Sequence, residues 1–136
     1  MAEAALKLTG RQEPLYREAP CNIEAEQALL GALLVNNDAF DRVWDFLKPE
    51  HFYEPLHRRI YQVAADLIRI GKTANPVTIK TFLPSDDKVG DMTVAQYLAR
   101  LAAEAVTVIN AEDYGRAIYD LAIRRALITI GEDIVN

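Results

Sequence analysis

Residues 22–35, NIEAEQALLGALLV, are the stretch that decides the fold. Asn22 is a favourable helix cap, and Glu24 and Glu26 follow at the positive end of the helix that it starts. Apolar residues then recur on one helical face: Ile23, Leu30, Leu33 and Leu34. The stretch predicts a helix that packs one side onto a core.

A second stretch, PEHFYEPLHRRIYQVAADLIRIG at residues 49–71, predicts the longest helix of the first half. Pro55 suits its first turn, and Gly71 suits its C-terminal stop. Its apolar face consists of Leu56, Ile60, Val63, Ala64 and Leu67. Neither stretch carries a catalytic constellation, so we interpret both as packing and docking surfaces.

The segments between and after these stretches are also helical in pattern. We expect a helix at 38–47, a short helix that starts at Asn75 or Thr78 and ends at Leu83, and a polar loop at 84–92. The apolar residues of the helix at 38–47 are Phe40, Val43, Trp44 and Leu47. No run alternates for long enough to predict a strand, so the fold class is all-α.

The last part of the chain predicts two further helices. Thr93 and Gln96 form a capping-box pattern ahead of an apolar face made of Val94, Tyr97, Leu98 and Leu101. A break at 105–109 follows, and Asn110 caps a final helix over 111–136. At 1.5 Å per residue that helix would be about 39 Å long, which is long for a small domain.

The final helix is apolar on two sides. One stripe holds Tyr114, Ile118, Leu121 and Ile128, and the other holds Ile123, Leu127, Ile130 and Ile134. One stripe is enough to lie against the preceding helix, so the second predicts a further protein partner. We predict that these eight residues form a protein interface.

These elements divide the chain into three parts. Residues 1–21 mix charges and prolines without a helical or strand period, which predicts a flexible arm. Residues 22–92 form a small helical globular bundle, and residues 93–136 form a C-terminal helical hairpin. The last helix meets no glycine or proline stop at its end, so we expect a hairpin truncated from a longer protein.

Composition restricts the function. The net charge is −5, and fifteen Lys and Arg show only two short basic pairs, so a nucleic-acid grip is not expected. Cys21 is the only cysteine, which leaves no internal disulfide and no thiolate metal site. No run has the length of a signal peptide or a membrane span, so we expect a soluble cytoplasmic protein.

Three motifs suggest chemistry that their surroundings do not support. Gly71-Lys72-Thr73 resembles the end of a phosphate-binding loop, but it follows a helix and the earlier glycine is absent, which favours a helix cap. Glu54 and His57 have the spacing of carboxylate-bridged metal bundles, but a second copy is missing. Arg58 and Arg59 are the best polar candidates for a contact site, and pairing within the domain is the default for both. We expect no catalytic, cofactor-binding or metal-binding residue.

Five pieces of the sequence, in order and with fitting gaps, resemble the N-terminal domain of the DnaB-type bacterial replicative DNA helicases. They are IEAEQALLGALL (23–34), HFYEPLHRRIY (51–61), PVTIKTFL (76–83), YLARL (97–101), and Asn110 and Tyr114 followed by RRALI (124–128). The chain departs from the family pattern at three places. His51 replaces the usual acidic residue, Thr93-Val94 the usual Gly-Gly, and Val106 the usual hairpin proline. These departures indicate a divergent member.

The resemblance implies a collar domain. In the family, hairpins pair into dimers, and three dimers form a collar over a hexameric ATPase motor, where the C-terminal domain of primase docks. The resemblance therefore implies primase and further copies of the chain as partners in the primosome. With these partners, we expect Ile128 and Ile134 at the partner contact and Leu127 at the dimer seam. ATP and Mg²⁺ belong to the motor domain of the parent family, so no cofactor is expected here.

Two other functions remain as alternatives. A stand-alone helical adaptor would share the fold and lack a motor, and a nucleic-acid-binding module would show DNA affinity that falls steeply with salt. The sequence leaves open the oligomeric state, the surface that primase uses, whether a helicase loader also docks, and where the natural chain ends.

Overall fold

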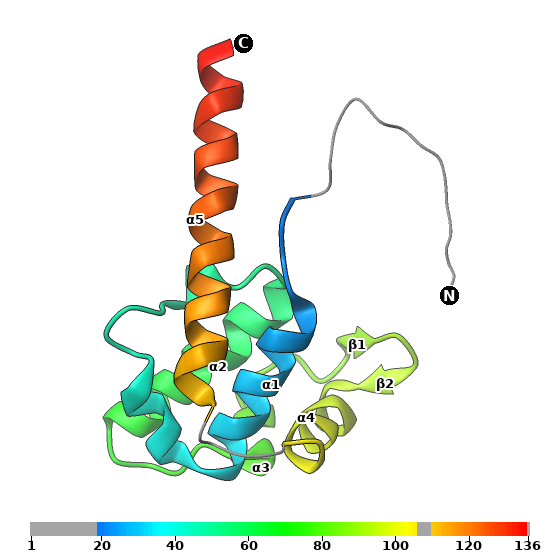
Figure 1. Ribbon diagram of the computed structural model, residues 1–136. Helices are drawn as coiled ribbons and strands as arrows, with labels where there is room; N and C mark the ends of the chain where they lie inside the picture. Colours follow the sequence, from blue (N-terminus) through cyan, green and yellow to red (C-terminus); the bar gives the residue numbers. More distant parts are fainter. Residues whose placement is uncertain (1–18, 106–109, 136) are drawn as a thin grey trace.

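Helix α1 (Ile23–Val35) runs through the middle of the fold, which the computed structural model describes for residues 19–105 and 110–135. The side chain of Asn22 accepts a hydrogen bond from the backbone N–H of Ala25 at 3.0 Å, as its capping role predicts. α1 lies between α4 and α5 (Figure 1) and also contacts α2. Neighbours on several sides bury more than the single face that the sequence predicts, and Leu29 and Ala32 are buried with Leu30, Leu33 and Leu34.

The segment after α1 is not the α-helix expected at 38–47. Residues Asn37–Arg42 form a 3-10 helix, η1, and turns follow it. The side chain of Asn37 donates to the carbonyls of Leu33 and Ala74, both at 2.8 Å, and accepts from the backbone N–H of Ala74. Asparagine side chains that bond to backbone groups compete with α-helix formation, which explains the tighter turn. The predicted core residues Phe40, Val43 and Leu47 are buried nonetheless.

Helix α2 (Pro55–Arg69) follows a second 3-10 helix, η2 (Pro49–His51). The predicted stop is confirmed, because Gly71 has a φ of +83°, in the region that favours glycine. α2 packs against an aromatic cluster in which the ring centroids of Phe52 and Tyr61 lie 4.8 Å apart. The Tyr61 hydroxyl donates to the Leu47 carbonyl at 2.8 Å, and burial raises the pKa of this tyrosine. Phe52 and Tyr61 are therefore core residues, whereas Tyr53 is exposed.

The short elements follow the local signals closely. Helix α3 (Pro76–Lys80) is capped by Asn75, and α4 (Val94–Ala103) begins with the predicted Thr93–Gln96 capping box. The predicted loop at 84–92 contains two short strands, β1 (Lys88–Val89) and β2 (Met92–Thr93), which pair antiparallel. Apart from this small sheet the described elements are helical, so the predicted all-α class is confirmed.

Helix α5 (Ala111–Val135) rises out of the globule (Figure 1). It packs on α1, η1 and η2, whereas α4 packs on α1 and α3. Here the structure differs from the expected hairpin at 93–136, because the apolar face of α4 is already covered by the globule. Most of the expected arm at 1–21, and the break before α5, lie outside the described residues. None of the helices in the described part is both long and apolar enough to cross a membrane.

Candidate functional site

The two halves of α5 have different surroundings. Every buried or half-buried residue of the helix lies between Ala111 and Arg125, and every residue from 126 to 135 is exposed. Gly115 allows the close contact of the first half, since a Cβ placed there would lie 2.7 Å from a methyl carbon of Val43. The second half has no contact with the globule that would bury it.

The exposed half of α5 is rich in large apolar side chains. Their exposed fractions are 40% for Ile123, 61% for Leu127, 49% for Ile128, 52% for Ile130, 79% for Ile134 and 85% for Val135. Residues 123, 127, 130 and 134 repeat at intervals of four, three and four, which is the spacing of a coiled-coil seam. Contiguous exposed apolar surface of this kind marks interaction sites.

The residues predicted for the interface fall into two groups. Ile118 is 2% exposed and packs in the core, and Tyr114 and Leu121 are half-buried beside it. The other five are exposed: Ile123 lies just before Arg125, and the projecting half after it carries Leu127, Ile128, Ile130 and Ile134. The structure thus divides the eight residues between attachment to the globule and an open apolar surface.

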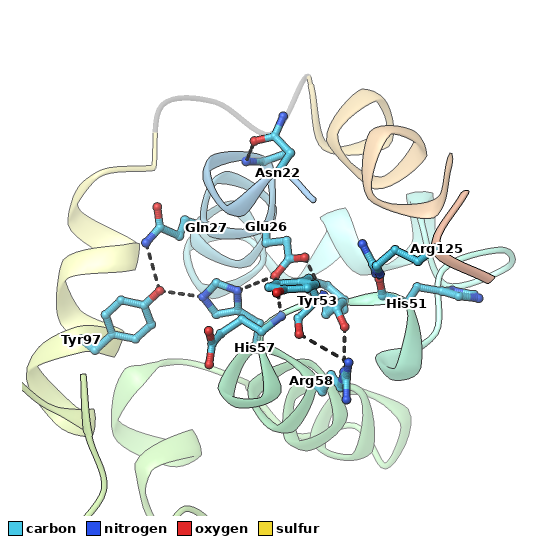
Figure 2. A network of polar contacts seen from close by, with 12 residues as sticks. Asn22, Glu26, Gln27, His51, Tyr53, His57, Arg58, Tyr97 and Arg125 are labelled. Atoms are coloured by element: carbon cyan, nitrogen blue, oxygen red, sulfur yellow. Dashed lines mark hydrogen bonds and ion pairs between the residues drawn. The ribbon is translucent and has the colours of Figure 1, made fainter. Parts of the chain in front are cut away.

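Aromatic and charged side chains form the junction where α5 leaves the globule. The ring of Tyr119 meets the ring of His51 edge-on at 5.0 Å, and the guanidinium of Arg116 lies 3.7 Å from the centre of the Phe46 ring. Figure 2 shows Arg125 beside His51, and Arg125 donates to the His51 carbonyl at 2.7 Å. These contacts connect α5 to the η2 segment.

His51 at this junction makes stability depend on pH. Burial is the largest cause that lowers the pKa of His51 below its ordinary value of 6.5, and the charges of Lys48 and Arg125 lower it further against the opposing effect of Glu50. The ring nitrogen Nδ1 also accepts from the Lys48 backbone N–H at 2.9 Å, and protonation would remove this acceptor. The folded state therefore binds this proton less tightly than the unfolded state.

We expect the free energy of unfolding to decline as the pH falls from 6.5 toward the lowered pKa of His51. The stabilisation by His51 is fully present above the pKa that this residue has in the unfolded chain. It is lost as the pH falls through the lower pKa of His51 in the folded state. Urea unfolding of the parent chain and of the variant His51→Gln at a series of pH values measures this pH dependence. An unchanged slope in His51→Gln would assign the pH dependence to other groups.

A buried polar chain, which sequence analysis missed, links α1, α2 and α4 (Figure 2). Glu26 and His57 are each 1% exposed. A carboxylate oxygen of Glu26 lies 2.7 Å from Nδ1 of His57, and Nε2 of His57 lies 2.6 Å from the hydroxyl of Tyr97. Gln27 donates to the same hydroxyl at 3.1 Å. Glu26 also accepts from the backbone N–H of Tyr53 at 2.7 Å, so its carboxylate holds the residues just before α2 as well.

One arrangement of protons satisfies the whole chain. Gln27 donates to Tyr97, the Tyr97 O–H donates to Nε2 of His57, and the Nδ1–H of His57 donates to Glu26. Burial raises the pKa of Tyr97, which keeps its donor proton in place. Because each buried donor meets an acceptor, the chain serves to hold three helices together.

A cleft borders this chain. It has a volume of about 540 Å³ and is lined by Glu54, Arg59, Asp87 and Lys88 among others. Arg59 lies 3.0 Å from the Asp87 carboxylate, and Arg58 donates to the Phe52 carbonyl at 2.7 Å. Both arginines therefore pair within the domain. In the described part of the chain no cluster of three potential metal ligands occurs, and His57 of the Glu54–His57 motif is engaged by Glu26.

A family model described as the DnaB-like helicase N-terminal domain matches residues 18–120. The chain belongs to this family. The solved N-terminal domain of DnaB helicase from Mycobacterium tuberculosis has a TM-score of 0.78 and 31% identity, and the match covers 87% of this chain and 82% of that one. The resemblance seen in the five sequence pieces is thereby confirmed.

Curated relatives of this DnaB-type N-terminal domain are much longer proteins. The replicative DNA helicase DnaB of Rickettsia conorii is 46% identical over 123 residues, which is 90% of this chain and 25% of the relative. That of Rickettsia bellii is 47% identical over 122 residues, 90% of this chain and 24% of the relative. The chain thus spans about a quarter of the length of the curated relatives it matches.

Proposed function

We propose that this DnaB-type domain is the self-association and primase-docking collar of a replicative DNA helicase acting in the primosome. The exposed apolar half of α5 is the observation that carries this proposal. The curated relatives of the domain are replicative helicases, and the chain covers about a quarter of their length. As part of the proposal, we assign ATP and Mg²⁺ to a motor domain elsewhere in such a protein. Replication of the chromosome places this function in the bacterial cytoplasm.

Self-association would cover the seam on α5. Complete burial of an exposed Leu or Ile side chain stabilises a complex by about 1.5–3 kcal/mol. A symmetric pair would bury the seam of both copies, where Leu127 and Ile134 are 61% and 79% exposed. Several such residues from each copy can exceed the association cost of about 4–15 kcal/mol. We assign Leu127 to the seam between copies.

Primase is the second proposed partner. A solved N-terminal domain of DnaB helicase from Helicobacter pylori, described with its interactions with primase, has a TM-score of 0.68 and 22% identity over 81% of this chain and 85% of that one. At 22% identity the Helicobacter pylori domain supports a shared fold alone. Primase as a partner of this chain is therefore part of the proposal. We assign the contact with the primase C-terminal domain to Ile128 and Ile134, near the far end of α5.

The variant Ile134→Asp tests this assignment. A charge at a residue that is 79% exposed costs the folded chain little, but within an interface it would be buried without a partner. We expect self-association or primase binding to weaken by about tenfold or more, measured by sedimentation velocity and by titration with the primase C-terminal domain.

Val77→Asp is the matched control. Val77 is 66% exposed on α3, so it receives the same change on a surface away from α5. We expect the control to associate as the parent chain does, with the same far-UV circular dichroism. Two results would contradict the assignment. One is global unfolding of the Ile134→Asp variant, seen as a loss of helicity over the whole domain. The other is equal self-association and equal primase binding in Ile134→Asp and Val77→Asp.

A further inference from the structure

Among the side-chain hydrogen bonds of the described residues, those of Arg125 span the greatest separation in sequence. Its Nη1 donates to the carbonyl of Pro20 and its Nη2 to the carbonyl of His51, both at 2.7 Å. Its guanidinium also lies 5.3 Å from the centre of the Tyr53 ring. One side chain thus connects α5 to the segment before α1 and to η2, which are 105 and 74 residues away in the sequence.

The position of Arg125 along the helix gives these bonds their importance. It is the last residue of α5 that is not exposed, and the free apolar half begins directly after it. The deeper attachment is made by Gly115 and Ile118, which are buried against the globule. Ile118 and Arg125 are two helical turns apart, about 10 Å along the axis. Tyr119 and Leu121 add half-buried contacts between these two positions, and Arg125 is the outermost attachment of the helix. Its two bonds therefore restrain the tilt of the helix at the point nearest to the exposed half.

We propose that Arg125 is a positioning residue that fixes the direction in which the apolar half of α5 projects from the globule. A forked guanidinium can donate to two carbonyls at once in a rigid geometry, and a lysine ammonium is a flexible point donor. The consequence for assembly rests on the proposed function. If the direction of α5 is fixed, the seam residues of two copies meet at one defined angle between the helices.

The neighbouring arginine provides the contrast. Arg124 is exposed, carries the same charge, and lies one residue earlier on the same helix. If the direction of α5 depended on charge or helix propensity, substitution of Arg124 or of Arg125 would therefore change it. An effect of the bridge to Pro20 and His51 would follow only the substitution of Arg125.

Distance measurement by pulsed electron spin resonance tests the proposal in the 136-residue chain. Spin labels are attached in a Cys21→Ser background through Ala99→Cys on α4 and Thr129→Cys on α5, both exposed sites. Labelled protein is diluted with unlabelled protein, so that only distances within one copy are read. The variants are Arg125→Lys, Arg125→Ala and Arg124→Lys.

We expect a narrow distance distribution in the parent and in Arg124→Lys, and a broader or shifted one in both Arg125 variants. Circular dichroism checks that the helices remain, and Arg125→Lys decides the test if Arg125→Ala does not fold. A parent-like distribution in the folded Arg125 variants, or equal broadening in Arg124→Lys, would overturn the proposal.

Sedimentation velocity of the same variants measures the effect of Arg125 on self-association. We expect the dissociation constant for self-association to rise by about tenfold in the Arg125 variants and to stay unchanged in Arg124→Lys. A parent that does not associate would refute the proposed function and leave the distance test of Arg125 intact. Association that is unchanged despite a broadened distribution would overturn the link between helix direction and assembly.

Discussion

The variant Glu26→Ala is expected to lower the free energy of unfolding by about 3–5 kcal/mol, because it removes two hydrogen bonds to a charged group, each of which contributes about 1.5–3 kcal/mol. The side chain is 1% exposed, and its carboxylate accepts from His57 and from the backbone N–H of Tyr53. Without it these buried donors have no acceptor. Urea unfolding followed by circular dichroism measures the loss.

Glu24→Ala is the matched control for this prediction. Glu24 occupies the first turn of the same helix and is exposed, so its loss should change the free energy of unfolding by less than about 1 kcal/mol. Glu26→Gln keeps an acceptor for the Tyr53 N–H and loses the carboxylate facing His57, so an intermediate loss of about 1–3 kcal/mol is expected. Equal stability of Glu24→Ala and Glu26→Ala would contradict a structural role for the buried chain.

The second large effect is expected at Gly31, where α1 lies close against α4. A Cβ at this position would lie 2.4 Å from the carbonyl oxygen of Leu101, a backbone atom that can move only if α4 moves. We expect Gly31→Ala to lower the free energy of unfolding by about 1–3 kcal/mol, as overpacking does. Thermal and urea unfolding of the variant provide the measurement.

Gly131→Ala separates this steric effect from helix propensity. Gly131 also lies within a helix, but no atom comes within 4 Å of a Cβ placed there. Alanine should therefore stabilise the helix by up to about 1 kcal/mol. A Gly31→Ala variant as stable as Gly131→Ala would mean that α1 and α4 are not in close contact.

Local signals in the sequence predicted most of the helix boundaries. Asn22 and Thr93 cap their helices through bonds within three residues, and Gly71 ends α2 through its own backbone conformation. Such features depend only on neighbours along the chain, so a single sequence contains them. The 3-10 helix η1 was missed because the bonds of Asn37 to Ala74 span 37 residues.

The buried chain of Glu26, His57 and Tyr97 shows why longer-range features escape sequence analysis. Its members are separated by 31 and 40 residues, and their meeting depends on how three helices pack. One signal was available: Glu26 lies three and four residues before Leu29 and Leu30, on the face of α1 that becomes buried. A charged side chain on a buried apolar face needs a hydrogen-bond or charge partner, so a buried partner for Glu26 could have been predicted from the sequence.

The candidate interface was partly accessible from the same reasoning. Periodicity alone separated the two apolar stripes of the last helix, and the spacing of residues 123, 127, 130 and 134 needs no structure. Which stripe the globule covers depends on tertiary packing, and so does the place of α4 beside α1 and α3. The role of Arg125 depends on carbonyls 74 and 105 residues away, which no local pattern indicates.

Light scattering on a size-exclusion column, with and without the cognate primase C-terminal domain, tests the collar function most directly. If the exposed half of α5 joins copies and receives primase, the chain elutes with the mass of a dimer or a larger species, and primase elutes with it. A strict monomer at every concentration, with primase eluting separately, would contradict the collar function.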